Sequence, residues 1–184
     1  QKRTLVLEGG SIETDGNGTL LTTAQCLLNP NRNPSFDQTA IEQQLCKDLG
    51  VKKINWLQNG ALQGDDTDSH IDTLARLCPN NVIAYQACDD ITDSHYPELQ
   101  LMADELQNMT SADGSSYRLI PLPWPSAKYD QTGQRLPATY ANFLVFNHLV
   151  IVPTYRDTKD SEALAQLAKA FPGYQVEGVP GRGG

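Results

Sequence analysis

The densest polar cluster of the sequence spans residues 64–73, where three aspartates lead into His70 and Asp72. Because the residues that follow favour a β-strand, the side chains of His70 and Asp72 would share one face of it. An imidazole beside a carboxylate suits general acid–base chemistry, and the carboxylate can also accept paired hydrogen bonds from a planar cation such as guanidinium. The plain alternative is a solvated acidic loop that enters a strand.

A second candidate carboxylate, Glu8, stands at the end of an apolar run and directly before Gly9 and Gly10. Glycines at this point would let another backbone segment or a ligand come close, since they carry no side chain. A simple turn would explain the same tripeptide. Glu8 and His70 nevertheless occupy matching places in two successive repeats, so both could face one axis of a radial fold.

The histidines of the chain do not favour a metal site. There are three of them, and none is paired with a cysteine or a glutamate at ligand spacing, so we expect no metal and no other cofactor. The tetrapeptide at residues 67–70 recurs at 92–95, where Asp93 or Ser94 can cap a helix that follows. His95 is therefore expected at the surface.

The four cysteines show no zinc-type spacing and lie in apolar or helical contexts. We expect reduced thiols in a protein core, which is the usual state in the cytosol. Buried thiols have raised pKa values and little thiolate, so none of the four is expected to be a nucleophile. These residues are Cys26, Cys46, Cys78 and Cys88.

The elements that must position these groups repeat along the chain as ββαβ units, at about residues 4–57, 70–122 and 140–179. Each unit has two short β-prone runs joined by a turn, then a helix with apolar residues along one face, then a closing strand. In particular, strands are expected over residues 4–7 and 71–77. These two strands would place Glu8 at the end of one and His70 at the start of the other.

The repeat also predicts the fold class. A unit of this length cannot bury its sheet alone and therefore implies a radial or stacked assembly. Open sheets would leave unpaired strand edges, which proteins normally avoid. We therefore expect an α/β, propeller-like fold in which residues 1–184 are a fragment of a single catalytic domain, with further units outside the chain.

The composition narrows the classes of function. Of 184 residues, 39% are hydrophobic and 20% are charged, which is typical of a folded domain. A total of 14 basic against 22 acidic residues gives a net charge of −8, which argues against a nucleic-acid surface and permits a cationic substrate. The sequence has no apolar stretch long enough to span a membrane.

Five segments of the sequence carry a resemblance to a known family. They are LEGGSI at 7–12, CLLNPNRNP at 26–34, DTDSHIDTLAR at 66–76, LPATYANF at 136–143 and VIVP at 150–153. In this order and over essentially the whole chain, the sequence resembles the agmatine deiminase and bacterial peptidyl-arginine deiminase family. The resemblance implies the pentein fold, a five-bladed α/β propeller of ββαβ units, of which about three blades would be present here.

The same resemblance implies roles for individual residues. His70 matches the general acid–base histidine, Asp72 a carboxylate that clamps the guanidinium, and Glu8 a glutamate that contacts the substrate or orients the histidine. In the family a cysteine thiolate attacks the guanidinium carbon, ammonia leaves with a proton from the histidine, and water hydrolyses the thiouronium intermediate. That cysteine and a second guanidinium-binding aspartate have no counterpart in this sequence and are expected outside it.

The implied function is the conversion of agmatine and water to N-carbamoylputrescine and ammonia, a step of polyamine and putrescine biosynthesis in the cytoplasm. Two alternatives stay open, namely the deimination of arginine in peptides and a non-catalytic guanidine-binding or structural propeller. The expected partners are a small cationic guanidino substrate and the missing N-terminal part of the same protein. A homo-oligomer is compatible with these expectations, whereas no nucleic acid or membrane is expected.

Overall fold

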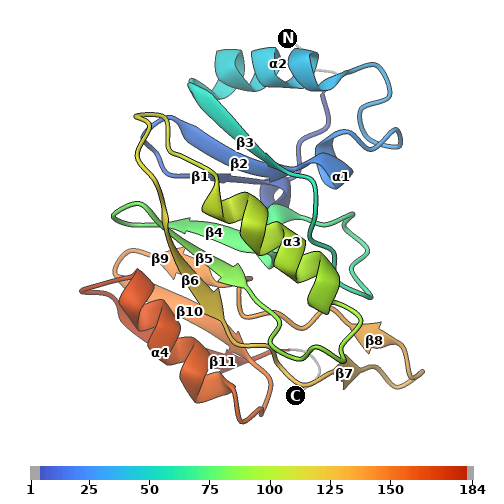
Figure 1. Cartoon of the computed structure of the whole chain (residues 1–184), viewed down its shortest axis with the longest axis vertical. Coiled ribbons are helices and arrows are strands. Elements are labelled where there is room, and N and C mark those ends of the chain that lie inside the picture. The colour runs from blue at the N-terminus through green and yellow to red at the C-terminus, as the bar shows by residue number, and fades with distance from the viewer. Residues whose placement is uncertain (1–4, 182–184) are drawn as a thin grey trace.

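Three separate three-stranded sheets, each with its own helix, follow one another along the chain (Figure 1). The structure is a computed structural model, and it describes residues 5–181. In every sheet the first two strands are antiparallel, and the third joins the second in parallel after the helix. Each sheet thus has the ββαβ order that the sequence predicts, because a parallel pair needs a crossover connection.

The first sheet consists of β1 (Ile12–Thr14), β2 (Thr19–Thr23) and β3 (Lys53–Leu57), with α1 (Ala24–Leu27) and α2 (Gln38–Leu49) between the last two. The side chain of Asp37 caps α2 by accepting the N–H of Ala40 at 2.8 Å, and Gly50 ends the helix in the left-handed region. These local signals are strong, and the helix lies where the sequence predicts it.

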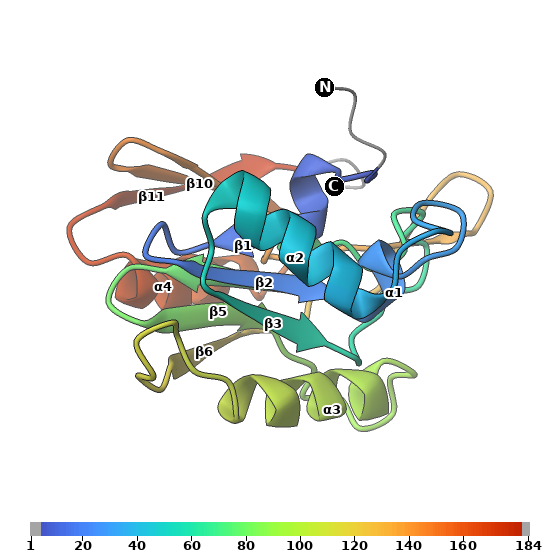
Figure 2. The ribbon, with the colours of Figure 1, turned by 90° about the horizontal axis from the view of Figure 1, so that it is seen from above.

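Strand β2 is buried along its whole length because both faces of the first sheet are covered. Leu20 packs with Ile41 and Leu45 of α2, whereas Leu21 packs against the second sheet and α3. Figure 2 shows α2 and α3 on opposite sides of β2 and β3. The first two sheets therefore share a continuous apolar contact.

The second sheet consists of β4 (Ala75–Cys78), β5 (Val82–Gln86) and β6 (Arg118–Leu122), and α3 (Tyr96–Gln107) connects the last two strands. The third sheet consists of β9 (Leu144–Phe146), β10 (Leu149–Thr154) and β11 (Gln175–Pro180), with α4 (Asp160–Ala170). A hairpin of β7 (Lys128–Tyr129) and β8 (Arg135–Leu136) lies between the second and third sheets in sequence. Apolar side chains of α4 join those of β5, β6 and β10 in one core.

The described residues show no closure of these sheets into a ring. The α/β class is confirmed, whereas the propeller closure expected from the repeat stays a prediction. None of the helices in this range is long and apolar enough to cross a membrane.

The strand expected over residues 4–7 is not formed within the described range, and Thr4 lies outside that range. The reason is a side chain that takes the place of a neighbouring strand. Asn33 accepts the N–H of Val6 at 2.9 Å and donates to the carbonyl of Val6 at 3.2 Å. Strand β1 begins later, after the short 3-10 helix η1 (Gly9–Ser11).

The strand expected over residues 71–77 is correct only in its second half. Residues Ile71–Thr73 form a 3-10 helix, η2, and β4 follows at Ala75. The backbone N–H and the hydroxyl of Thr73 both donate to the carbonyl of His70, at 3.2 and 2.8 Å, which turns the chain tightly. His70 and Asp72 are therefore placed by a turn, and the shared strand face expected for them is wrong.

The expectation that His95 lies at the surface is also wrong. Its side chain is 5% exposed, its Nδ1 bonds Asp93 at 2.7 Å, and its Nε2 accepts the backbone N–H of Gln63 at 2.9 Å. The carboxylate of Asp93 is held by Arg135 and Trp124 and does not cap the helix, which starts after His95. The second copy of the tetrapeptide thus fixes the β7–β8 hairpin to the second unit.

Candidate functional site

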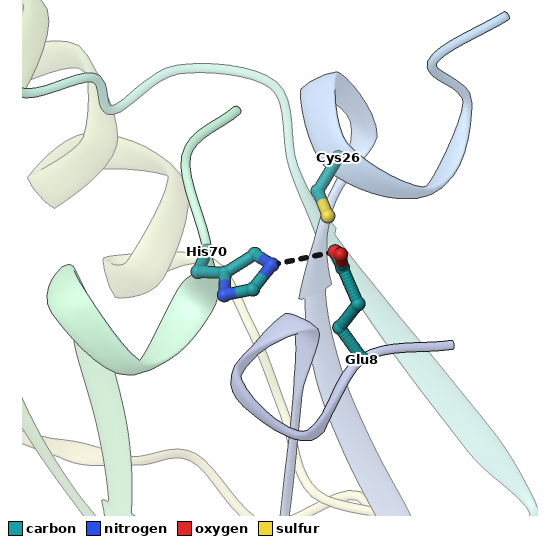
Figure 3. A group of neighbouring side chains, drawn as sticks. All are labelled: Glu8, Cys26 and His70. Carbon is teal, nitrogen blue, oxygen red and sulfur yellow. Dashed lines mark hydrogen bonds and ion pairs between the residues drawn. The ribbon is translucent and has the colours of Figure 1, made fainter. Parts of the chain in front are cut away.

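The candidate site lies where η1 and η2 contact each other, at the junction of the first two units. Glu8 immediately precedes η1, His70 immediately precedes η2, and Cys26 projects from α1 (Figure 3). Three segments that are far apart in the sequence therefore meet at one point.

A hydrogen bond joins Glu8 and His70, the two residues whose matching places in successive repeats suggested that they face one axis. Nε2 of His70 lies 2.8 Å from Oε2 of Glu8, as the dashed line in Figure 3 marks. The same oxygen accepts a hydrogen bond from Nε of Arg32 at 2.8 Å. The bond to His70 and then the bond to Arg32 lower the pKa of Glu8 below its ordinary value. Glu8 is thus an ionised partner for the imidazole at neutral pH.

Gly10 allows η1 to pack directly on the side chains of the second unit. A Cβ at this position would lie 2.6 Å from both Nδ1 of His70 and Oδ2 of Asp72, whereas one at Gly9 would meet nothing within 4 Å. The side chains of His70 and Asp72 therefore both reach the space that a side chain at position 10 would occupy. The sequence predicts that another segment or a ligand comes close to these glycines, and at Gly10 the side chains of His70 and Asp72 do so.

Asp72 is a half-buried carboxylate, and burial is the largest cause that raises its pKa above the ordinary value. The charges of Arg76 and His70 oppose that shift. A carboxylate kept partly out of water attracts a cation more strongly than an exposed one does. Asp72 is therefore suited to bind a guanidinium, as its sequence context suggested.

The acidic loop before His70 is a folded turn, so the solvated-loop alternative does not describe it. Asp65 accepts the backbone N–H groups of Thr67 at 3.0 Å and of Ser69 at 2.8 Å. Asp68 and Ser69 both have left-handed backbone conformations, at φ of 58° and 59°. A hydroxyl from the first unit, that of Thr23, donates to the carbonyl of Ser69 at 2.7 Å. These contacts fix the backbone that carries the imidazole.

Cys26 is the nearest thiol to the Glu8–His70 pair, and the sequence did not place it there. The expectation of core thiols is confirmed for Cys26, Cys78 and Cys88, which are buried, and is wrong for Cys46, which is partly exposed. Burial raises the pKa of Cys26 to about 11, so the thiol form dominates at neutral pH. Cys26 opens the segment at 26–34 that contributes to the family resemblance, whereas Cys78, whose pKa burial raises to about 12, lies in none of those segments.

The ligand atoms of Glu8, Cys26 and His70 lie within 4.8 Å of one another, and this is the one set of metal-type donors in residues 5–181. Carboxylate, thiolate and imidazole are ligands that Zn²⁺ accepts. However, Arg32 is bonded to the same Glu8 oxygen as His70, and its positive charge opposes a cation there. The geometry therefore suits recognition and proton transfer better than metal binding.

Comparison with known proteins gives this geometry a family context. The sequence matches the Porphyromonas-type peptidyl-arginine deiminase family over residues 1–183. A Yersinia pseudotuberculosis protein provisionally named agmatine deiminase is 41% identical over 194 residues, which cover 97% of this chain and 53% of the relative.

Solved structures give the same result. A protein from Porphyromonas gingivalis, provisionally named arginine deiminase, is 50% identical, with a TM-score of 0.93. The match covers 97% of this chain and 52% of that protein's chain. The C. jejuni agmatine deiminase with substrate bound is 45% identical with a TM-score of 0.89, over 97% of this chain and 51% of that one.

The chain spans about half the length of the relatives that it matches. A more distant similarity, to an amidinotransferase from Microseira wollei in a saxitoxin pathway, has 13% identity and a TM-score of 0.56 over 96% of this chain and 42% of that one. At this identity the similarity shows a shared fold only.

Proposed function

Because the chain belongs to the Porphyromonas-type peptidyl-arginine deiminase family, we propose that it supplies the acid–base and cation-binding half of a site that hydrolyses a guanidinium group. The observation that carries the proposal is the Glu8–His70 hydrogen bond at 2.8 Å beside the half-buried Asp72. An imidazole held by one carboxylate and flanked by another is what this chemistry requires.

In the proposed reaction a cysteine thiolate adds to the guanidinium carbon, and Asp72 holds the planar cation. The C–N bond to the departing amino group breaks, and His70 gives that group a proton so that it leaves as ammonia. His70 then takes a proton from water, which attacks the carbon and releases the thiolate and the ureido product. Glu8 orients the imidazole and stabilises its charged form.

The nucleophile of this proposal is a cysteine outside the present sequence. Burial raises the pKa of Cys26 to about 11 and that of Cys78 to about 12, so neither supplies much thiolate at neutral pH. Cys88 is also buried, with a raised pKa for the same reason. The second guanidinium-binding aspartate, the closure into a five-bladed pentein propeller and any homo-oligomer belong to the same set of proposals.

We propose agmatine as the substrate, with N-carbamoylputrescine and ammonia as products, in cytoplasmic putrescine synthesis. Relatives that bear the name agmatine deiminase support this choice, and one was solved with its substrate bound. The family description favours a second candidate, arginine in peptides. The carboxylates of Glu8 and Asp72 beside His70 suit either guanidinium.

Ammonia release by the full-length protein tests the proposal, with agmatine, free arginine and an arginine peptide assayed in parallel. Activity on agmatine alone would support the first substrate, and activity on the peptide alone would support the second. No release from any of the three would favour the third alternative, a guanidine-binding or structural protein, and binding of agmatine measured by calorimetry would then distinguish those two.

A further inference from the structure

The guanidinium of Arg32 bridges the two segments that carry Glu8 and His70. Its Nε donates to Oε2 of Glu8 at 2.8 Å. Its two terminal nitrogens reach the acidic loop, where Nη1 donates to the carboxylate of Asp68 and Nη2 to the carbonyl of Thr67 at 3.0 Å. One side chain thus ties the first unit to the loop that ends in His70.

We propose that Arg32 is the positioning residue of this site, which holds the Glu8 carboxylate against His70 and fixes the loop that carries the imidazole. The inference rests on the proposed deiminase function for its consequence on turnover. Its structural content, that Arg32 ties Glu8 to the loop that carries His70, stands on the contacts alone. No substrate contact is assigned to Arg32.

The segment that carries Arg32 is itself rigidly held. The side chain of Asn33 is buried, accepts the backbone N–H of Val6 at 2.9 Å and donates to the carbonyl of Leu27 at 2.9 Å. Val6 lies two residues before Glu8. Asn33 thus fixes the backbone that leads to Glu8, and its neighbour Arg32 fixes the carboxylate of Glu8. Preorganised sites are built from supporting contacts of this kind.

The charges around Glu8 show how Arg32 acts on it. The other ionisable groups around Glu8 and its partners are His70, Asp65, Asp68, Asp72, Arg76 and Cys26. The hydrogen bond from Arg32 lowers the pKa of Glu8 and comes second only to the bond with His70. Arg32 is 14% exposed and pairs with Glu8 and Asp68, so it favours the ionised Glu8 that meets the imidazole.

A lysine cannot replace this arrangement. The guanidinium offers donors in a flat fork, and here each of its nitrogens has a separate acceptor on one of two segments. An ammonium is a compact point charge that can pair with Glu8 or with the loop but does not span both. Arg32→Lys therefore separates the charge of Arg32 from its bridging geometry.

The test uses the full-length protein, its Arg32→Met and Arg32→Lys variants, and Arg135→Met as a matched control. Arg135 is similarly buried, at 16% exposure, and its guanidinium pairs with Asp93 and lies over the Trp124 ring, so its side chain serves a different carboxylate. The pKa of Glu8 is followed by ¹³C NMR of its carboxyl group, and kcat and KM for agmatine are measured across pH.

We expect Arg32→Met to raise the pKa of Glu8, to lower kcat roughly 10- to 100-fold with little change in KM, and to move the acidic limb of the pH profile upward. Arg32→Lys should keep much of the low pKa of Glu8 but lose most of kcat. Arg135→Met should lower stability and leave the pKa of Glu8 unchanged.

A folded Arg32→Met variant with the wild-type pKa of Glu8 and wild-type kcat would overturn the proposal. If Arg32→Met does not fold, Arg32→Lys decides, since wild-type kcat in that variant excludes the bridging role. If the wild-type protein releases no ammonia from any guanidino substrate, the proposed function fails, and the pKa of Glu8 still decides the inference on Arg32.

Discussion

The charge of Asp72 opposes folding, because burial outweighs its favourable neighbours and raises its pKa. A carboxyl with a raised folded-state pKa loses stability as pH rises from the unfolded pKa through the folded one, and the full cost is present above both. We therefore predict that Asp72→Asn raises the thermal midpoint at pH 7 while it weakens the binding of agmatine. The gain should vanish in acid, below the ordinary range of aspartate, as measured by calorimetry at several pH values.

Glu8 provides the opposite case and serves as the control. Its pKa is lowered by His70 and Arg32, so its ionised form stabilises the folded state above the unfolded pKa, and that contribution is lost as pH falls through the folded pKa. Glu8→Gln should accordingly lower the thermal midpoint at pH 7 and have little effect in acid. Equal shifts of the same sign in both variants would contradict these assignments.

The thiols give a third prediction at the level of single residues. With a pKa of about 11, roughly one Cys26 in ten thousand is a thiolate at pH 7, and the side chain is buried as well. Cys46 is partly exposed. Among the cysteines of this sequence, iodoacetamide should therefore alkylate Cys46 first, as followed by peptide mass spectrometry. Faster labelling of Cys26 than of Cys46 would show that Cys26 is an activated thiol after all.

At the scale of elements, the contact between η1 and η2 depends on one glycine of a pair. A methyl group at Gly10 would stand 2.6 Å from the tips of His70 and Asp72, and side-chain tips can move without unfolding the protein. We predict that Gly10→Ala folds but displaces both side chains, with a loss in kcat/KM of roughly 100-fold.

Gly9→Ala is the matched control, since a Cβ there has open space and its backbone is not left-handed. It should retain near-wild-type kcat/KM and melting temperature. Equal losses in the two alanine variants would mean that the tripeptide matters as a flexible turn and not as a point of close approach.

The elements that could be predicted from the sequence are those with local signals. Helix α2 has its cap at Asp37, its apolar stripe and its stop at Gly50 within one short segment. The 4–7 strand was wrong because the polar groups of Val6 pair with Asn33, which is 27 residues away. Such a contact competes with strand pairing and leaves no periodic trace in the sequence.

The candidate site divides in the same way. Glu8, His70 and Asp72 could be singled out because repeats and polar motifs mark them. The prediction that His70 begins a strand was wrong, since it precedes the 3-10 helix η2. Arg32 and Cys26 both lie in the motif at residues 26–34, but the sequence alone indicates no role in the site for either residue. Both become part of the site through the packing of α1 and the segment after it against the acidic loop, and that packing is a tertiary property.

At the scale of the whole molecule, Arg76 of β4 connects all three sheets. Its Nε donates to Glu13 of β1 at 2.8 Å, and its Nη1 donates to the carbonyl of Phe143, next to β9, at 2.6 Å. The guanidinium also lies over the Phe143 ring, 4.6 Å from its centroid. This residue therefore joins the first and third units to the second through one guanidinium.

The Arg76–Glu13 pair is nearly buried, at 15% and 14% exposure, and burial still raises the pKa of Glu13 above its ordinary value despite the attraction of Arg76. The pair thus costs desolvation that it only partly recovers, and removal of one partner leaves an uncompensated charge. We predict that Arg76→Met lowers the free energy of unfolding by about 3 kcal/mol. Adding Glu13→Gln to it should restore part of that loss, because the stranded carboxylate is gone. Urea denaturation of the two single variants and the double variant measures this coupling, and strictly additive losses would show that Arg76 joins the sheets through Phe143 alone.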